Sequence, residues 1–318
     1  MPSFTNFLRI TRKKFEFEQG KRRSVMKLKE ALKGILEDNE LKKLIASYDI
    51  IGDIILIRIH PDLESKRVII ADALHKIHPR VRSVTAVPLY SYTDKLYRTK
   101  DLEVIWGDEN LETTHKESGC FFRVNPRSVF FSPRLSYERM RIAKKVLYGE
   151  TIINMFSGVG CFSIVIAKKQ PRTKIYSIDV NPYAYEYMKK NVRLNKMEGK
   201  VIPILGDVRE ELKKLGLEGV ADRVLMPLPE QAHSFLPFAA RALNLDKEGA
   251  GSVIHYYDIA QGRKEDDLFK MSFKRAKDIL ASALENSLRV EIGEQRIVRS
   301  VAPRKYHIVL DLHIERMG

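Results

Sequence analysis

Apolar residues follow two different rhythms along this chain, and the rhythm changes near Thr151. Before that point, helical spacing alternates with short apolar runs. The predicted helices there are 25–45 and a shorter one through Ile70, Leu74 and Ile77 that ends at Pro79, and the predicted strands are 54–59 and 82–87. This pattern predicts a small α+β domain over residues 24–120.

After Thr151, strand-like apolar runs alternate regularly with helical patterns. The predicted strands are 151–155, 174–178, 200–205, 223–226, 252–257 and 307–312, and the predicted helices are 162–167, 184–195, 235–243 and 266–284. Such alternation is typical of a doubly wound, Rossmann-like α/β sheet, which binds ligands at the carboxyl ends of its strands. We therefore expect a second domain of this class over residues 121–318.

The charge balance adds a class of partner to this picture. The chain has 56 basic and 41 acidic residues, a net charge of +15, and its first 23 residues form a basic segment. Such a chain is attracted to polyanions, and nucleic acid fits better than an anionic membrane, because no basic amphipathic helix with a strongly apolar face stands out. The same excess of lysine is also compatible with a role in solubility alone.

Features absent from the sequence disfavour membrane-spanning, secreted and metal-binding proteins. It has no run of eighteen apolar residues and no signal-peptide core near its start, so we expect no membrane span and a cytoplasmic location. Its two cysteines, Cys120 and Cys161, have neither metal-site spacing nor the number needed for a disulfide framework. We therefore expect no metal site.

A glycine turn with two downstream carboxylates forms the strongest chemical signal. Gly158 and Gly160 follow the predicted strand 151–155, and Asp179 and Asp207 lie at the ends of the next two predicted strands. Glycines let the backbone turn tightly against a ligand, and a carboxylate at the second strand end can accept both ribose hydroxyls of a nucleoside. Taken singly, the glycines also fit an ordinary tight turn, and each aspartate fits a helix N-cap.

The combination favours S-adenosyl-L-methionine (AdoMet) as the cofactor. The turn has neither the third glycine of a dinucleotide fingerprint nor the Lys-Ser/Thr of a P-loop, so it is not built for phosphates. Asp207 can accept a hydrogen bond from an adenine amine, while Val180 and Val208 can enclose the ring. AdoMet is a nucleoside without phosphates, and it matches this set of groups.

These motifs resemble those of the archaeal and eukaryotic tRNA (guanine-37-N1)-methyltransferases, from about Tyr48 to the C-terminus. The resemblance rests on Phe130-Phe131-Ser132-Pro133-Arg134-Leu135, on Glu138-Arg139 and on Met155-Phe156-Ser157-Gly158-Val159-Gly160, with supporting phrases at 113–117, 222–226 and 302–305. It implies a class I methyltransferase sheet, methyl transfer from AdoMet to N1 of guanosine 37, and tRNA bound through its anticodon stem-loop, partly by the N-terminal domain.

The resemblance also implies roles for individual residues. Glu138 would be the general base that removes the N1 proton, and Arg98 would stabilise negative charge on O6. Arg134, Phe156 and Pro227 would lie at the cofactor. Without the resemblance, Glu138 reads equally well as a helix residue paired with a neighbouring arginine, and Arg98 as a phosphate contact.

Three departures from the family pattern bear on specificity. The family usually has Asp where Asn154 stands, which removes one charge near the cofactor. The usual Asn-Leu-Pro after Met is replaced by Pro227-Leu228-Pro229, so an amide that would place the guanine is absent. Residues before Tyr48 are few for the tRNA-sensing domain of relatives, which predicts tolerance of imperfectly folded tRNA.

Two other functions stay open. A wyosine-pathway enzyme would act on a modified guanosine 37, transferring either methyl or the aminocarboxypropyl group of AdoMet. A non-catalytic relative would bind RNA and hold AdoMet weakly. Glu138 disfavours aminocarboxypropyl transfer, but Pro227 keeps a variant substrate open. Glu138 and Arg98 together argue against a non-catalytic relative. We expect the chain to act as a monomer.

Overall fold

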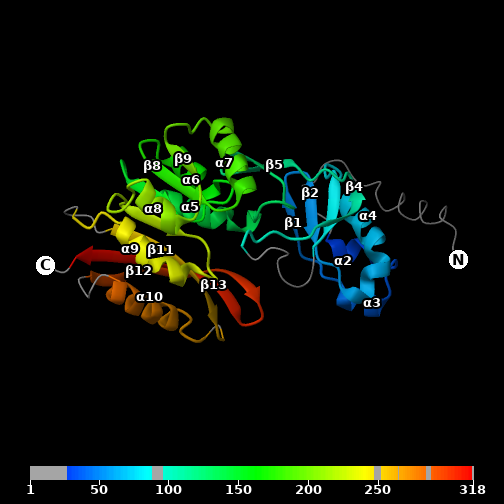
Figure 1. Cartoon of the computed structure of the whole chain (residues 1–318). Helices are drawn as coiled ribbons and strands as arrows, with labels where there is room; N and C mark the ends of the chain where they lie inside the picture. The colour runs from blue at the N-terminus through cyan, green and yellow to red at the C-terminus, as the bar shows by residue number, and fades with distance from the viewer. Residues whose placement is uncertain (1–26, 88–95, 247–251, 264, 284–287, 317–318) are drawn as a thin grey trace, which may run out of the picture.

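The computed structural model describes residues 27–87, 96–246, 252–263, 265–283 and 288–316 of the 318-residue chain. A small N-terminal unit lies to one side of a larger α/β unit, as Figure 1 shows in blue to cyan against green to red. The predicted basic segment 1–23 lies outside the described residues.

The N-terminal unit is a mixed sheet covered by short helices. Its strands run in the order β1 (Tyr48–Ile51), β2 (Ile54–Ile57), β3 (Ser83–Ala86), β4 (Glu103–Gly107), and only the β2–β3 pair is parallel. Its helices are α2 (Leu28–Ala31), α3 (Asp38–Lys43), the 3-10 turn η1 (Pro61–Lys66) and α4 (Arg67–Ile77). The strands predicted at 54–59 and 82–87 and the helix that ends before Pro79 are confirmed.

The single helix predicted over 25–45 is wrong. The structure breaks it at Gly34, whose φ of 75° lies in the left-handed region that glycine adopts without strain, and α2 and α3 flank the break. Leu28, Leu32, Leu36 and Leu41 are nevertheless all buried in one cluster. The apolar period therefore located the buried face correctly without showing where the helix stops.

The larger unit has a seven-stranded sheet within the described residues. Its order is β12 (Leu288–Ala302), β13 (Lys305–Arg316), β11 (Ser252–Gln261), β10 (Arg223–Met226), β7 (Thr151–Asn154), β8 (Lys174–Asp179), β9 (Val201–Leu205). The five strands from β11 to β9 are parallel, and β13 is antiparallel to both of its neighbours. The strand order reverses between β10 and β7, so ligands are expected at the carboxyl ends of these strands. The predicted doubly wound α/β class is confirmed.

Helices cover both faces of this sheet. One face carries α5 (Ser136–Lys145, preceded by the 3-10 turn η2, Pro133–Leu135), α6 (Cys161–Lys169) and α7 (Pro182–Leu194); the other carries α8 (Val208–Lys214), the 3-10 turn η3 (Ala232–Phe235), α9 (Leu236–Ala242) and α10 (Lys270–Ala283). Local chemistry explains where α7 begins. The Asn181 side chain accepts hydrogen bonds from the backbone nitrogens of Tyr183 and Ala184, and Pro182 occupies the first helical position.

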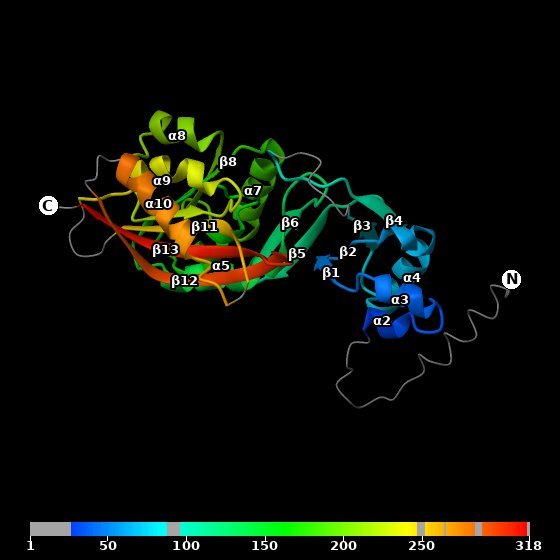
Figure 2. The same cartoon turned by 90° about the horizontal axis from the view of Figure 1, so that it is seen from below.

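The long strand β12 was not predicted. It forms the edge of the sheet, pairs only with β13 among the described strands, and is largely exposed toward its end, so its sequence mixes charged and apolar residues. The β12–β13 hairpin, red in Figure 2, extends toward the N-terminal unit. This hairpin therefore extends from the larger unit toward the N-terminal unit, which is distant from it in the sequence.

A separate hairpin of β5 (Thr113–Glu117) and β6 (Cys120–Val124) lies between the two units in the sequence and spans the predicted boundary at residue 120. Its inward side chains Cys120, Phe122 and Val124 pack in the core of the larger unit. The division into domains over residues 24–120 and 121–318 stays a prediction.

Candidate functional site

A cavity of about 270 Å³ opens at the carboxyl ends of β7, β8, β9 and β10. It brings together most of the residues that the sequence placed at the cofactor: Phe156, Gly158, Asp179, Val180, Asp207, Val208 and Pro227. These residues are up to 71 positions apart in the chain, yet each follows a strand of one parallel sheet. This cavity is therefore the candidate cofactor site.

The glycine turn forms one end of the cavity. Gly158 and Gly160 have φ values of 55° and 89°, which only glycine adopts readily. Gly158 lines the cavity, whereas Gly160 begins α6 and does not line it. A Cβ at Gly160 would lie 3.0 Å from Cγ of Met188, so this glycine allows close helix packing. The structure therefore gives Gly160 a folding role and does not bring it to the cavity.

Asp179 connects the second strand to the glycine turn. Its Oδ2 accepts a hydrogen bond from the Gly158 backbone nitrogen at 2.6 Å, and its Oδ1 accepts one from the Asn181 nitrogen at 3.0 Å. Burial raises the pKa of this carboxyl, and the two backbone donors oppose that rise. Asp179 thus fixes the turn and also presents a carboxylate to the cavity, in the position predicted for ribose binding.

Asp207 has the predicted place and a helix-capping role as well. It is the N-cap of α8, where its side chain accepts a hydrogen bond from the Arg209 nitrogen, and it pairs with the Arg209 guanidinium. That guanidinium lowers the pKa of the carboxyl. The N-cap alternative and the ligand interpretation are compatible, because the residue also lines the cavity.

Apolar side chains form the rest of the wall. Phe156 packs edge to face against Phe235 with ring centroids 4.9 Å apart, Val180 is exposed toward solvent and Val208 is buried. Phe235 lies on η3 and was not singled out from the sequence, because no strand end or glycine marks it. Apolar walls around a carboxylate and a glycine turn suit an uncharged adenosine moiety, so the residues present fit AdoMet.

A second cavity of about 320 Å³ adjoins the first. The two share Arg98, Phe130 and Pro227, and the second also contacts the N-terminal unit through Ser47–Asp49 and Arg58. Its basic lining residues are Arg58, Arg98, Lys100, Arg134, Arg299 and Lys305. Burial, and then the positive charge of Arg58, lower the pKa of Lys100. We call this space the basic cavity; its charge suits a polyanion.

Arg98 stands at the junction of the two cavities, as its predicted role requires. Its guanidinium lies 4.9 Å from the Phe130 ring centroid and 3.9 Å from Glu230, and its φ of 57° places the backbone in the left-handed region. Arg134 lies elsewhere than predicted. It lines the basic cavity and pairs with Asp49 at 2.5 Å instead of lining the cofactor cavity.

Glu138 lies behind the basic cavity and lines neither space. Its side chain is 2 % exposed. It accepts hydrogen bonds from Tyr257 at 2.8 Å and from Arg141 at 2.8 Å, and Arg141 continues to Asp311 at 2.7 Å. The pairing with a neighbouring arginine, the alternative considered from the sequence, is therefore observed. A role as base stays a prediction.

Asn154 does not line the cofactor cavity either. It is completely buried, and its Nδ2 donates to Oγ of Ser163 at 3.1 Å. Ser177 donates to the same Ser163 oxygen at 2.7 Å. A neutral amide therefore joins a network of neutral hydroxyls below the glycine turn, where it can support that turn without touching the ligand.

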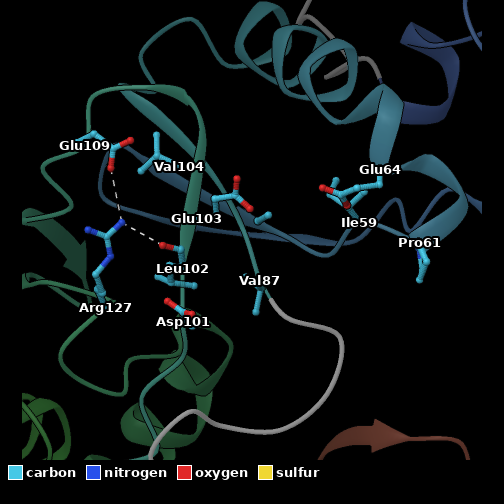
Figure 3. Close-up of a pocket in the computed structure, with 11 residues that line it drawn as sticks. Ile59, Pro61, Glu64, Val87, Asp101, Leu102, Glu103, Val104, Glu109 and Arg127 are labelled. Carbon is cyan, nitrogen blue, oxygen red and sulfur yellow. Dashed lines mark hydrogen bonds and ion pairs between the residues drawn. The ribbon is translucent and has the colours of Figure 1, made fainter.

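A further cavity, of about 910 Å³, has the opposite charge. Figure 3 shows Glu64, Asp101, Glu103 and Glu109 around it, with Arg127 as the single basic residue of its described lining. Arg127 already interacts with Glu109 and with the Leu102 carbonyl. Carboxylates repel phosphates, so this cavity is not the nucleic-acid site.

Within the described ranges, no helix is long and apolar enough to span a bilayer, and no cluster of three metal-binding side chains occurs. The fold and the two cavities therefore define a Rossmann-like protein with a nucleoside-type cofactor cavity beside a strongly basic one. This is the arrangement of an AdoMet-dependent transferase with an anionic substrate.

Comparisons with known proteins specify the family. Residues 113–290 match the TRM5/TYW2 methyltransferase domain, and residues 28–110 match the TYW2 N-terminal domain. The chain belongs to the TRM5/TYW2 methyltransferase family, which confirms the resemblance seen in its motifs.

Relatives in this family carry several names. The chain is 37% identical to tRNA (guanine(37)-N(1))-methyltransferase Trm5b of Pyrococcus abyssi, over 86% of this chain and 77% of that protein. It is 34% identical to tRNA 4-demethylwyosine(37)-methyltransferase Taw21 of Saccharolobus solfataricus, over 90% and 99%. It is 30% identical to a tRNA(Phe) (4-demethylwyosine(37)-C(7)) aminocarboxypropyltransferase of Methanocaldococcus jannaschii, over 85% and 98%.

Solved structures agree with the fold. Wild-type Trm5b from Pyrococcus abyssi aligns with a TM-score of 0.79 at 36% identity, over 94% of this chain and 83% of that one. A complex of aTrm5 with tRNALeu aligns at 0.76 and 36% identity, over 94% and 81%. Methanocaldococcus jannaschii TYW2 in complex with AdoMet aligns at 0.63 and 28% identity, over 85% and 100%. AdoMet is the cofactor of this enzyme, as the sequence predicted.

Proposed function

We propose that this enzyme transfers the methyl group of AdoMet to N1 of guanosine 37 in the anticodon loop of tRNA. The observation that carries the proposal is the junction of the two cavities at Arg98, Phe130 and Pro227. A nucleoside cofactor in the first cavity and a base in the second would meet there. The relatives named Trm5b and the tRNA complex of aTrm5 support this choice of substrate.

The reaction requires one group that removes a proton from the base and another that stabilises the negative charge on it. AdoMet supplies an electrophilic methyl group on a sulfonium. N1 of guanine carries a proton that must leave before or during attack, and negative charge then develops at O6. Arg98 lies at the junction, where its guanidinium can donate to O6. A base in a stacked loop must first be extruded, which costs a few kcal/mol, and the basic cavity offers phosphate contacts that offset this cost.

Glu138 is proposed as the residue that removes the N1 proton. Tyr257 links Glu138 to the basic cavity. The Tyr257 hydroxyl contacts Glu138, and the Tyr257 ring centroid lies 5.5 Å from that of His307, which lines the cavity. Catalytic hydrogen bonds are often incomplete before the substrate binds. The role therefore requires a local rearrangement when the base enters.

Mass spectrometry of the product tests the proposal. Unmodified tRNA is incubated with the enzyme and AdoMet, digested, and its position-37 nucleoside identified; a tRNA with adenosine at position 37 serves as the control. We expect 1-methylguanosine only from the first substrate. Recovery of unmodified guanosine 37 would refute the proposal, and tRNA binding without any transfer would indicate a non-catalytic relative.

A second candidate is methyl transfer to a 4-demethylwyosine already present at position 37. Two observations favour it: a relative that is 34% identical is named Taw21, and Pro227 replaces the family's usual asparagine. The same assay with tRNA carrying 4-demethylwyosine decides between the candidates. Transfer only to that tRNA favours the second candidate, and the added mass distinguishes a methyl from an aminocarboxypropyl group. Monomeric state and cytoplasmic location stay predictions.

A further inference from the structure

Two buried polar side chains line the basic cavity with no hydrogen-bond partner among the described residues. They are His307, on β13, and Ser132, just before η2. His307 is 4 % exposed and Ser132 is 5 % exposed. Both ring nitrogens of His307 and Oγ of Ser132 are unpaired. Buried polar groups are nearly always paired in folded proteins, because an unpaired one loses its hydration without compensation. Two such residues at one cavity point to a ligand.

The charges around His307 define which ligand groups it can take. Burial, and then the positive charges of Arg299 and Arg98, lower the pKa of its imidazole to about 3. The ring is therefore neutral near pH 7 and offers one donor and one acceptor. The Ser132 hydroxyl offers the same pair of functions. Neutral groups of this kind suit the edge of a nucleobase, whereas the cations of the cavity suit phosphates.

The apolar part of the surrounding wall suits the faces of an aromatic ring. Phe130, Phe131, Pro227 and Ile259 supply apolar surface to the same cavity. RNA-binding proteins recognise unstacked bases by apolar or aromatic contact on their faces and hydrogen bonds on their edges. Lys100, Arg299 and Lys305 line the same cavity, where their positive charges suit the backbone of the same nucleotide.

We propose that Ser132 and His307 hydrogen-bond the edge of the extruded purine at position 37 and so determine which base is accepted. Because Arg98 is assigned to O6, the groups left for this pair are the 2-amino group and N7. The inference rests on the proposed action on guanosine 37.

Substrates that lack single edge groups test this assignment. Single-turnover rates are measured with tRNAs carrying guanosine, inosine (no 2-amino group) or 7-deazaguanosine (no N7) at position 37. The enzymes compared are the wild type, Ser132→Ala and His307→Ala, with His313→Ala as a matched control on the same strand that lines neither cavity.

We expect each cavity variant to lose about tenfold in rate on the full base, the size of one lost hydrogen bond, and to lose much less on one of the two analogues. His313→Ala should keep the wild-type ratios. An equal loss on all three substrates, or unchanged rates in both variants, would overturn the inference. Absence of any transfer by the wild type would instead refute the proposed function.

Folding is controlled separately. Ser132→Ala removes only an unpaired hydroxyl, so its thermal unfolding and its AdoMet affinity should match the wild type, and this variant carries the test if His307→Ala does not fold. A Ser132→Ala protein with normal AdoMet binding and an unchanged preference for guanosine over both analogues would exclude Ser132 as a contact of the base.

Discussion

The Tyr257 hydroxyl donates a hydrogen bond to Oε1 of Glu138 over 2.8 Å, and both side chains are buried. This contact links the centre of β11 to helix α5. The proposed base lies outside both cavities, where its carboxylate pairs with Arg141. Substitution of Glu138 distinguishes a catalytic role of this residue from a purely structural one.

Glu138→Gln should lower turnover by at least about a hundredfold, because a general base contributes at least this much, and AdoMet affinity should stay within about twofold. Rapid-quench methyl transfer and calorimetry measure the two quantities. Glu150→Gln is the matched control, since Glu150 is a buried carboxylate paired with Arg223. If both variants lose only stability and keep normal turnover, Glu138 is a structural residue.

Asp179→Asn should weaken AdoMet binding by about tenfold to a hundredfold, because it removes a charged acceptor from the cavity and weakens the hold on Gly158. Binding of tRNA should be unaffected. Equilibrium dialysis with labelled AdoMet measures the change. Asp222→Asn is the control, because Asp222 accepts from the Thr151 nitrogen at the start of β7, at the opposite end of that strand. Equal effects of the two substitutions would argue against a ligand role for Asp179.

Gly160→Ala should cost about 2–3 kcal/mol of unfolding free energy, since it combines left-handed strain with crowding against Met188 and Ile164. Gly199→Ala should cost only about 1 kcal/mol, because its φ is also positive but a Cβ there meets nothing within 4 Å. Urea denaturation measures both. Similar losses would mean that close packing at Gly160 contributes little.

Lys100→Gln and Lys305→Gln should each weaken tRNA binding and make it less sensitive to salt. Each lost phosphate contact should reduce the slope of log K against log salt concentration by roughly 0.7–0.9. Filter binding over a range of salt concentrations provides the slopes. Lys274→Gln, on α10 and paired with Asp278, should leave the slope unchanged. Unaltered slopes for both cavity variants would place the RNA backbone elsewhere.

The buried imidazole of His307 predicts a pH dependence of stability. Its pKa falls from an unfolded value of about 6.5 to about 3 in the folded protein. The unfolded chain therefore takes up a proton that the folded protein refuses, and stability falls as the pH drops below about 6.5. Relative to His307→Gln, the wild type should lose up to about 1.4 kcal/mol per pH unit between pH 6 and 4.

Denaturant titrations at pH 7.5, 6, 5 and 4 check this difference. His255, also buried with a lowered pKa, contributes equally to both proteins and cancels in the comparison. A difference between wild type and variant that stays constant from pH 7.5 to 4 would show that folded His307 accepts a proton normally.

The sequence by itself determined the features that depend on neighbours along the chain. Apolar periods located the parallel strands, and the turn at Gly158 and Asp179 followed from residues adjacent to strand ends, because parallel strands deliver their carboxyl ends to one edge. The AdoMet cavity was therefore predictable. Gly34 and the edge strand β12 were not, since one glycine does not always end a helix and an exposed strand has a mixed sequence.

Only the tertiary structure decided which distant side chains share a cavity. It placed Arg134 beside Asp49 in the basic cavity and Glu138 against Tyr257. It also brought Ser132 and His307, from opposite ends of the larger unit's sequence, to the lining of one cavity. The spacing of residues along the chain does not predict which side chains share a cavity, because this depends on how β13 and the segment before α5 pack in space. Burial then decides the charge of each group, and burial is a property of the folded molecule.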